Sequence, residues 1–342
     1  MRADASPTIG MGHVMRCIAL AEAAREQGAE CIFVTSCASD GVLQKIQTAA
    51  DEVFLLDEIH PDSRDLAALS FICQEFQPDG IILDGYHFDE EYQLRVRDLA
   101  PRVLVIDDTC HLRKYHCDIL LNQNLGAERL PYSLGRPARL LLGPEYALIR
   151  QEFIRSRIAG RTAREIPRNV LVTLGGADPG NYTLKVMEAL KGLEVHTRIV
   201  LGPLNPAGDQ IESKAHELML QAPQTRIEIV RSSPDMPALM NWADIAVTSA
   251  SSTCWELMFM GVPMVTLTTA SNQHMINNNL LEGKRAVFAE IENGMKAKSL
   301  REAIAVMMSH YDRRQLLITQ NQKIIDGHGK YRILSNLLHR SK

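Results

Sequence analysis

The chain has 342 residues, of which 46% are hydrophobic, 5% aromatic and 23% charged, and its formal net charge is −4. This length suits two domains of about 150 residues each, and the acidic balance excludes a polybasic surface for nucleic acid or anionic lipid. The low aromatic content also argues against a platform that stacks nucleic-acid bases.

Cysteine usage and hydropathy indicate the compartment. The 7 cysteines form no CxxC pair, which is typical of free thiols in a reducing cytoplasm. The first residues lack the apolar stretch of a signal peptide, and no apolar run approaches the roughly 18 residues that span a bilayer. We therefore expect a cytoplasmic protein, without membrane insertion, that acts as a monomer.

Short apolar runs alternate with amphipathic helical stretches along the chain, and this pattern predicts α/β sheets. In such sheets, ligands bind beyond the carboxyl ends of the strands. Unbroken apolar runs predict strands buried on both faces of a parallel sheet. The expected fold class is α/β, with two Rossmann-like doubly wound domains at residues 1–158 and 166–342, an arginine-rich linker and an interdomain cleft. The expected strands are residues 31–35, 80–84, 103–107, 118–122, 169–173, 196–200, 226–230, 244–248 and 263–267.

A glycine-rich loop near the start, Gly10-Met-Gly12-His13, precedes an expected helix. Backbone N–H groups at such a helix start attract an anion. The loop lacks the third glycine of the dinucleotide fingerprint, and the next strand has no acidic end, so a nicotinamide site is disfavoured. His13 and Arg16 share one helix face and would point into the cleft. The alternative is a helix-capping histidine beside a surface arginine.

Two further glycine or serine turns follow strands in the second half. Gly175 and Gly176 precede a helix and could take a phosphate, or they form a plain turn with Asp178 and Pro179 at the helix start. Small hydroxyl residues at Ser249, Ser251 and Ser252 let a diphosphate approach the backbone. Glu256, one turn into the next helix, could accept both ribose hydroxyls or only balance the helix dipole. Cys254 lacks a local histidine, which disfavours a nucleophile.

Polar side chains also follow other strands. Asn272 and Gln273 suit hydroxyl and phosphate groups, or they cap a helix. In the first half, acidic strand ends at Asp84 and at Asp107-Asp108 face the cleft, where Tyr86 could stack on a sugar or uracil; helix and loop capping is the alternative for the aspartates. The Cys/His residues between 110 and 117 have the wrong spacing for a zinc site. Without DxD or HExxH motifs, we expect no metal ion and no cofactor.

Together these features resemble the GT-B architecture, in particular the superfamily of the lipid-II-forming N-acetylglucosaminyltransferase. The closest resemblance is to the hydrolases of UDP-2,4-diacetamido-2,4,6-trideoxy-β-L-altropyranose in pseudaminic acid biosynthesis. The family pattern has more apolar residues before the first motif, so either the first strand is short or the start was assigned late. The motifs that carry the resemblance are RADAS at 2–6, GMGH with Arg16, DGY at 84–86, IDD at 106–108, HCDILLN at 116–122, GPEYALIR at 143–150, LGG at 174–176, SASS with Glu256, and Asn272-Gln273.

The resemblance implies roles for particular residues. His13 matches the catalytic histidine, and the residues implied to bind substrate are Asp4, Gly12, Arg16, Tyr86, Asp108, Gly175, Gly176, Ser249, Ser251, Ser252, Glu256, Asn272 and Gln273. The second domain would hold UDP. The implied reaction is inverting hydrolysis of a UDP-sugar to UDP and free sugar, with His13 as the base or as a phosphate-orienting group. The alternatives are a UDP-sugar glycosyltransferase, a hydrolase of a related diacetamido sugar from the legionaminic acid route, and a nucleotide-sugar-binding regulator.

Overall fold

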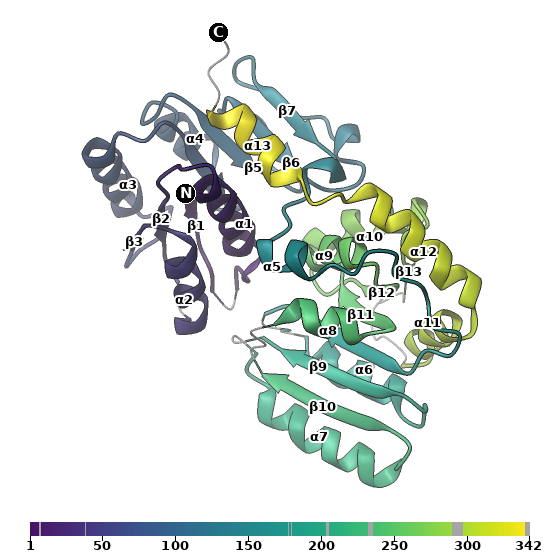
Figure 1. Cartoon of the computed structure of the whole chain (residues 1–342). Coiled ribbons are helices and arrows are strands. Elements are labelled where there is room, and N and C mark those ends of the chain that lie inside the picture. The colour runs from purple at the N-terminus through teal and green to yellow at the C-terminus, as the bar shows by residue number, and fades with distance from the viewer. Residues whose placement is uncertain are drawn as a thin grey trace. The chain divides into compact units, whose positions relative to one another are not determined.

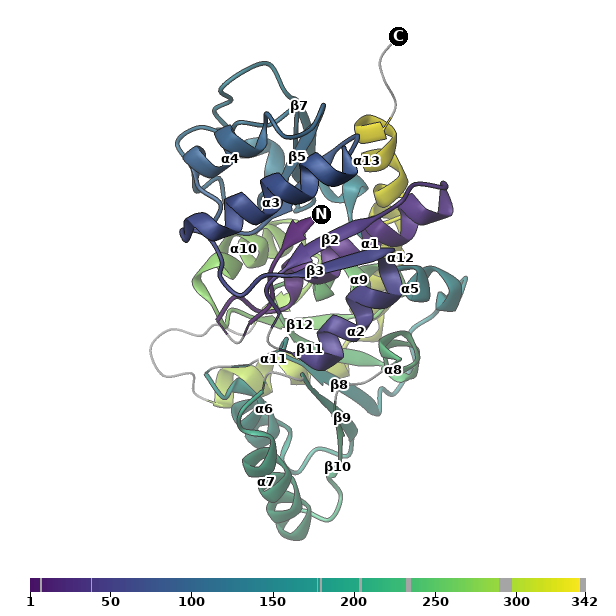
Figure 2. The same cartoon turned by 90° about the vertical axis from the view of Figure 1, so that its left-hand side faces the viewer.

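The computed structural model describes residues 1–6, 8–37, 39–176, 178, 180–202, 205–231, 235–288 and 297–338. The chain divides into two compact units (Figures 1 and 2). The first unit is Met1–Gln151 with the segment that begins at Gly327, and the second is Glu152–Asp326.

The described part of the first unit contains a seven-stranded parallel sheet in the order β3-β2-β1-β4-β5-β6-β7. Its strands are β1 (Arg2–Ala3), β2 (Ile32–Thr35), β3 (Glu52–Leu55), β4 (Ile81–Asp84), β5 (Val103–Ile106), β6 (Ile119–Asn122) and β7 (Arg139–Leu142). The order reverses between β1 and β4, which places a topological switch point at their carboxyl ends.

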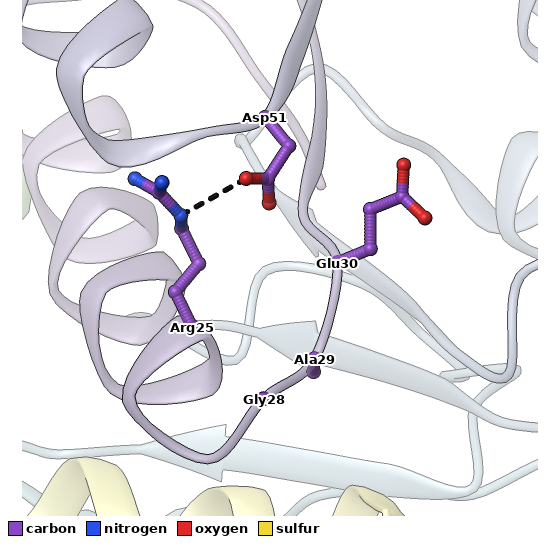
Figure 3. A pocket seen from close by; sticks show the side chains of 5 residues that line it. All are labelled: Arg25, Gly28, Ala29, Glu30 and Asp51. Carbon is purple, nitrogen blue, oxygen red and sulfur yellow. Dashed lines mark ion pairs between the residues drawn. The ribbon is translucent and has the colours of Figure 1, made fainter.

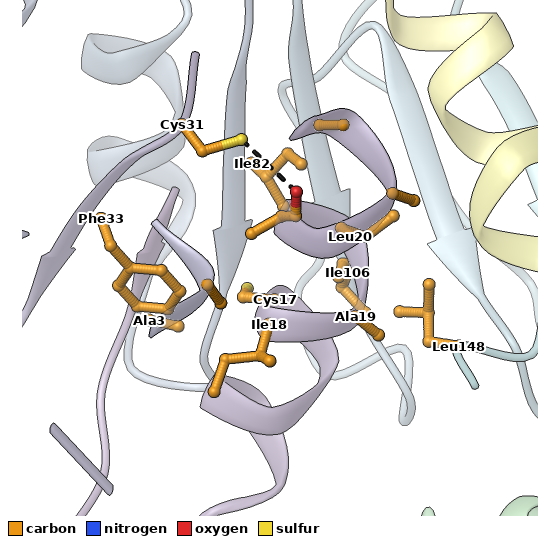
Figure 4. Close-up of a cluster of buried hydrophobic side chains, with 14 of the residues drawn as sticks. Ala3, Cys17, Ile18, Ala19, Leu20, Cys31, Phe33, Ile82, Ile106 and Leu148 are labelled. Atoms are coloured by element: carbon orange, nitrogen blue, oxygen red, sulfur yellow. Dashed lines mark hydrogen bonds between the residues drawn. The ribbon is translucent and has the colours of Figure 1, made fainter. Parts of the chain in front are cut away.

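Successive side chains along these strands point to opposite faces of the sheet, and both faces are packed against helices. Ile82 and Ile106 lie in one hydrophobic cluster with α1 and α2, as Figure 4 shows around α1, whereas Leu83 and Val105 lie in another with α3 and α4. Burial on both faces is the reason that the strands are apolar throughout. The helices of this unit are α1 (Gly12–Glu26), α2 (Asp40–Ala49), α3 (Ser63–Phe76), α4 (Glu90–Val96) and α13 (Gly329–Leu338), with 3-10 turns η1 (Ala127–Arg129) and η2 (Pro144–Tyr146).

Helix α13 belongs to the first unit although it follows the whole second unit in the chain (yellow in Figure 1). Its residues Ile333 and Leu337 join the cluster around α1. Gly329 lies so close to the backbone of Ala147 that a side chain would collide with it, and the buried Lys330 donates a hydrogen bond to Gln151 at 2.9 Å. Close packing and a satisfied buried charge thus hold the helix in place.

The described part of the second unit contains a six-stranded parallel sheet in the order β10-β9-β8-β11-β12-β13. Its strands are β8 (Asn169–Thr173), β9 (His196–Leu201), β10 (Arg226–Arg231), β11 (Ile245–Ser249), β12 (Met264–Leu267) and β13 (Val287–Phe288). The helices are α5 (Gln151–Ser156), α6 (Tyr182–Leu190), α7 (Gly208–Gln221), α8 (Met236–Trp242), α9 (Thr253–Met260), η3 (Ser271–Gln273), α10 (His274–Glu282), α11 (Ala297–Ser309) and α12 (Tyr311–Ile324). Here the order reverses between β8 and β11.

The nine strands expected from the sequence all occur within a residue or two of their predicted ends. Three strands, β3, β7 and β13, were not expected, and they lie at sheet edges. The first strand, β1, has two residues, as in the alternative of a short first strand. Edge strands are short and lie partly in solvent, so they lack the unbroken apolar run that marks a central strand.

The unit boundaries differ from the expected domains at two places. The tail assigned to the second domain folds onto the first unit as α13. The expected linker packs on the second unit through its arginines: Arg157 donates to the carbonyl of Gln322 at 3.2 Å and stacks on Phe259, and Arg161 donates to the carbonyl of Met240 at 3.0 Å. These two arginines of the expected linker thus donate to backbone carbonyls of the second unit.

Candidate functional site

In the first unit, functional side chains gather at the switch point between β1 and β4. The turn after β1 is closed by a hydrogen bond from the backbone N–H of Gly10 to the carbonyl of Ser6 at 2.8 Å, and Gly10 has φ +82. Such a conformation favours glycine. The turn starts α1 at Gly12, which makes His13 the second helical residue and places Arg16 one turn later.

His13 is held by the last residue of β4. Its Nδ1 lies 2.6 Å from Oδ1 of Asp84, a carboxylate that is fully buried. An ionised carboxylate only accepts hydrogen bonds, so we assign the ring proton to Nδ1. Nε2 makes no hydrogen bond to the described residues and is not among their buried unpaired polar atoms, so this nitrogen keeps contact with solvent although His13 as a whole is buried. The imidazole therefore presents an unprotonated nitrogen at the carboxyl end of the sheet.

Arg16 joins His13 and two acidic strand ends. Its guanidinium donates to both oxygens of Asp84, at 2.6 and 2.9 Å, and to Oδ2 of Asp108 at 2.6 Å. The 3.0 Å approach of the guanidinium to Nδ1 of His13 is a close polar contact, because neither nitrogen can accept in this arrangement. One buried cation thus pairs with two buried carboxylates.

Asp108 accepts two further hydrogen bonds. Tyr86 Oη donates to its Oδ2 at 2.9 Å, and Asn124 Nδ2 donates to its Oδ1 at 2.8 Å. Burial by itself would raise the pKa of this carboxyl group, but the charge and hydrogen bond of Arg16, together with the Tyr86 hydroxyl, outweigh burial and hold the pKa below its usual range. The ring of Tyr86 also contacts that of His13 edge to face, with centroids 4.8 Å apart.

The structure therefore brings four of the expected residues, His13, Arg16, Tyr86 and Asp108, into one network. The alternative of a helix-capping histidine beside a surface arginine is wrong, because α1 has no side-chain cap at its start and Arg16 is buried. Gly12 begins α1 next to open space.

Asp4 lies in a separate buried network after β1. Its Oδ1 accepts from Arg2 at 2.5 Å and from the backbone N–H of Ser36 at 2.6 Å, while Oδ2 lies 2.9 Å from Nε2 of His87. These partners occupy both oxygens. Contact between Asp4 and a substrate stays a prediction, and the geometry favours a positioning role for it.

In the second unit, the loop after β8 contains Gly175 with φ +89. A side chain at Gly202, after β9, would collide with the backbone of Gly176, so the two loops pack backbone to backbone. The buried Asp178 accepts from the N–H groups of Tyr182 and Thr183, each at 2.9 Å. The plain-turn alternative placed Asp178 at the N-cap, but the N-cap residue of α6 is Asn181; Asp178 nevertheless accepts from the first two N–H groups of the helix. Pro179 lies outside the described residues.

The serine turn links β11 to α9. Ser249 ends the strand, and Ser251 and Ser252 lead into the helix, where Glu256 lies in the first turn and is partly exposed. The backbone N–H groups of Ser252 and Thr253 have no hydrogen-bond partner among the described residues. Burial raises the pKa of the Cys254 thiol to about 12, which agrees with the expectation that it is no nucleophile.

Asn272 and Gln273 form the 3-10 turn η3 after β12. Gln273 Oε1 accepts from the backbone N–H and the hydroxyl of Thr269, at 2.8 and 3.1 Å, so this amide braces its own loop. Asn272 is exposed. Any contact of these two residues with a ligand stays a prediction.

Sequence reasoning missed several residues of these clusters. Asn124 follows a strand end, which was an available signal, whereas Gly202 has no neighbouring motif. His111 was considered only as a metal ligand, but its Nδ1 lies 2.7 Å from Oδ2 of Asp107. No group of three or more His, Cys, Asp or Glu residues in the described ranges is placed to hold a metal ion.

A hollow elsewhere in the first unit carries no comparable chemistry. It lies beside the carboxyl end of α1, the end opposite to His13. Figure 3 shows that Arg25 pairs with Asp51, with Nε 3.1 Å from Oδ1, whereas Glu30 points away from both. Among the described helices, each is too short or too polar to span a lipid bilayer.

A known protein family matches a region that lies mostly in the second unit. Residues 169–332 match the glycosyltransferase family 28 C-terminal domain. This family 28 match starts at β8 and contains the glycine loop, the serine turn and η3, but it covers just under half of the chain.

More extended similarities are distant in sequence. An uncharacterized protein of Methanocaldococcus jannaschii is 28% identical over 272 residues, which are 77% of this chain and 54% of that protein, so the chain spans about half of this relative's length. A UDP-2,4-diacetamido-2,4,6-trideoxy-β-L-altropyranose hydrolase of Campylobacter jejuni is 25% identical over 80% of this chain and 92% of its own.

The crystal structure of Acinetobacter baumannii MurG matches over 98% of both chains, with a TM-score of 0.68 at 15% identity. The chain has the GT-B fold, with two parallel, doubly wound α/β units. The expected fold class is thereby confirmed.

Proposed function

We propose that this chain is an inverting, metal-independent hydrolase of a UDP-sugar, and most specifically of UDP-2,4-diacetamido-2,4,6-trideoxy-β-L-altropyranose, as a step of pseudaminic acid biosynthesis. The family 28 match supports nucleotide-sugar processing in general. The Campylobacter jejuni hydrolase supports the specific reaction. The observation that carries the proposal is His13, an imidazole whose Nδ1 is fixed by a buried carboxylate and whose Nε2 is open.

In the proposed step, Nε2 of His13 takes a proton from water while the water oxygen forms a bond to the anomeric carbon. The bond from that carbon to the UDP oxygen breaks, and UDP leaves with the electron pair. Attack opposite the leaving group inverts the anomeric centre. Asp84 stabilises the imidazolium that forms, and a general base of this kind contributes about 10²–10⁴-fold to the rate.

The remaining residues have proposed binding roles. Gly12 precedes His13 in α1, and Arg16, Tyr86 and Asp108 belong to its network; we propose that these four residues hold the sugar and the scissile bond. In the second unit, the N–H groups of Ser252 and Thr253, which have no partner in the described part of the chain, suit the charge that develops on UDP. The proposed UDP contacts are Gly175, Gly176, Ser249, Ser251, Ser252, Glu256, Asn272 and Gln273.

The test incubates purified protein with a panel of UDP-sugars and water alone, and follows release of UDP. Hydrolysis in water enriched in heavy oxygen should place the label on the sugar and not on UDP, and NMR of the nascent sugar should show the inverted anomer. His13→Gln should lower turnover by about 10²–10⁴-fold with little change in UDP affinity, whereas the exposed His310→Gln should leave both unchanged. A fully active His13→Gln protein would refute the assignment. If UDP affinity falls together with the rate, His13 orients the phosphates instead.

The family 28 match favours one alternative, a UDP-sugar glycosyltransferase on the same fold. Such an enzyme would leave UDP-sugars almost intact until an acceptor is added. The panel also separates the altropyranose substrate from a related UDP-diacetamido sugar.

A further inference from the structure

A second carboxylate-bound histidine lies next to the His13 network. His111 Nδ1 is 2.7 Å from Oδ2 of Asp107, whose side chain is buried, while 29% of the His111 side chain is exposed. Asp107 follows β5 and Asp84 ends β4, and these strands are neighbours in the sheet. Two histidine–aspartate pairs therefore occur at adjacent strand ends.

The ring of Tyr86 contacts both imidazoles. Its ring contacts His13 with an interplanar angle of 86°, and it contacts His111 with centroids 5.6 Å apart and an angle of 83°. Both histidines thus meet the same aromatic ring nearly at right angles.

The loop around His111 is built to fix this imidazole. Asp107 Oδ1 accepts from the N–H groups of Thr109 and Cys110, at 3.0 and 2.6 Å, and from the Tyr132 hydroxyl at 3.0 Å. Cys110, directly before His111, has φ +55, a conformation that costs a non-glycine residue free energy and tends to persist at functional sites.

The position of the ring proton determines which nitrogen of His111 can accept a hydrogen bond. The Asp107 carboxylate can only accept, so Nδ1 of His111 carries the proton and Nε2 is an acceptor. Nε2 has no hydrogen-bond partner in the described ranges and is not among their buried unpaired atoms. It is a fixed, open hydrogen-bond acceptor next to Tyr86.

We propose that His111, oriented by Asp107, binds the sugar of the substrate by accepting a hydrogen bond from a hydroxyl or amide N–H group, while His13 acts on the anomeric carbon. This role rests on the proposed UDP-sugar hydrolysis. It makes His111 a specificity residue, because only a sugar with a donor at that position satisfies Nε2.

Two substitutions test the role in the full chain. His111→Ala removes the acceptor. Asp107→Asn keeps Oδ1 for the loop but presents an NH₂ group to the imidazole, which moves the ring proton to Nε2. KM is measured with the UDP-sugar that the wild-type protein hydrolyses fastest. Each substitution should raise this KM by about tenfold, which corresponds to the loss of one neutral hydrogen bond. The kcat value and inhibition by UDP should change little. His216→Ala, on an exposed face of α7, is the control.

A binding measurement tests the proposed role of His111 independently of hydrolysis. In a His13→Gln background, which keeps the substrate intact, the imidazole NMR signals of His111 should shift with the UDP-sugar and not with UDP. If wild-type protein releases no UDP but these signals shift, the proposed reaction fails and the His111 role stands. Unchanged KM in both variants, or signals that do not respond to saturating UDP-sugar, would overturn the role.

Discussion

The Asp84 carboxylate lies 2.6 Å from Nδ1 of His13, although 71 positions separate the two residues in the chain. The parallel sheet makes this contact, because β1 and β4 are neighbours and both end at the same edge. The pair fixes which nitrogen of His13 carries a proton, so the chemistry of the histidine depends on a residue outside its own loop.

Asp84→Asn should impair catalysis without removing the histidine. The amide would present an NH₂ group to Nδ1 or weaken the contact with Arg16, and either change disturbs the ring that must accept a proton at Nε2. We expect kcat to fall by about 10²-fold or more, measured as UDP release under saturating substrate. Asp98→Asn, an exposed carboxylate of the same unit, is the control, and equal rates for both variants would contradict the tautomer argument.

Arg16→Met should destabilise the first unit severely. It leaves two buried carboxylates without their cation, which costs about 3–5 kcal/mol for a broken buried pair. The exposed pair of Arg95 and Glu91 gives the matched comparison: Arg95→Met should cost about 0.5 kcal/mol or less. Urea unfolding followed by circular dichroism measures both, and similar midpoints would show that the Arg16 network contributes little.

Acid should weaken the same network. The folded-state pKa of Asp108 lies below its unfolded value of about 3.9, so its ionised form contributes stability at neutral pH. That contribution is lost as the pH falls through the folded-state pKa. Unfolding midpoints of wild type and Asp108→Asn should differ at pH 7 and converge as the pH falls toward and below the unfolded pKa. A constant difference across this range would contradict the assignment.

Gly202→Ala should disturb the glycine loop of the second unit. The new methyl group would collide with the backbone of Gly176 and push that loop away from its position. We expect a stability loss of about 1–3 kcal/mol from overpacking and a UDP affinity about tenfold or more weaker, by calorimetry. Gly41→Ala, in α2 with open space around it, should instead be neutral or stabilise by about 0.5–1 kcal/mol. Unaltered UDP binding by Gly202→Ala would argue against nucleotide contact at this loop.

The sequence predicted the inner strands other than β1 well, because strands buried on two faces leave an unbroken apolar signature. Edge strands such as β3 and β7 carry a weaker one. The sequence also identified His13, Arg16 and the acidic strand ends as candidates. It did not reveal that one guanidinium joins Asp84 to Asp108, or that Gly202 fits against Gly176, because such contacts depend on the register of strands that are distant in the chain.

The position of α13 bears on the order in which the protein can fold during synthesis. This helix completes the core of the first unit, but the ribosome makes it only after the whole second unit. The hydrophobic surface of α1 that α13 covers is therefore exposed while residues 152–326 emerge. The unit that is made first is thus finished last, and chains that stop early would leave it with an open, aggregation-prone core.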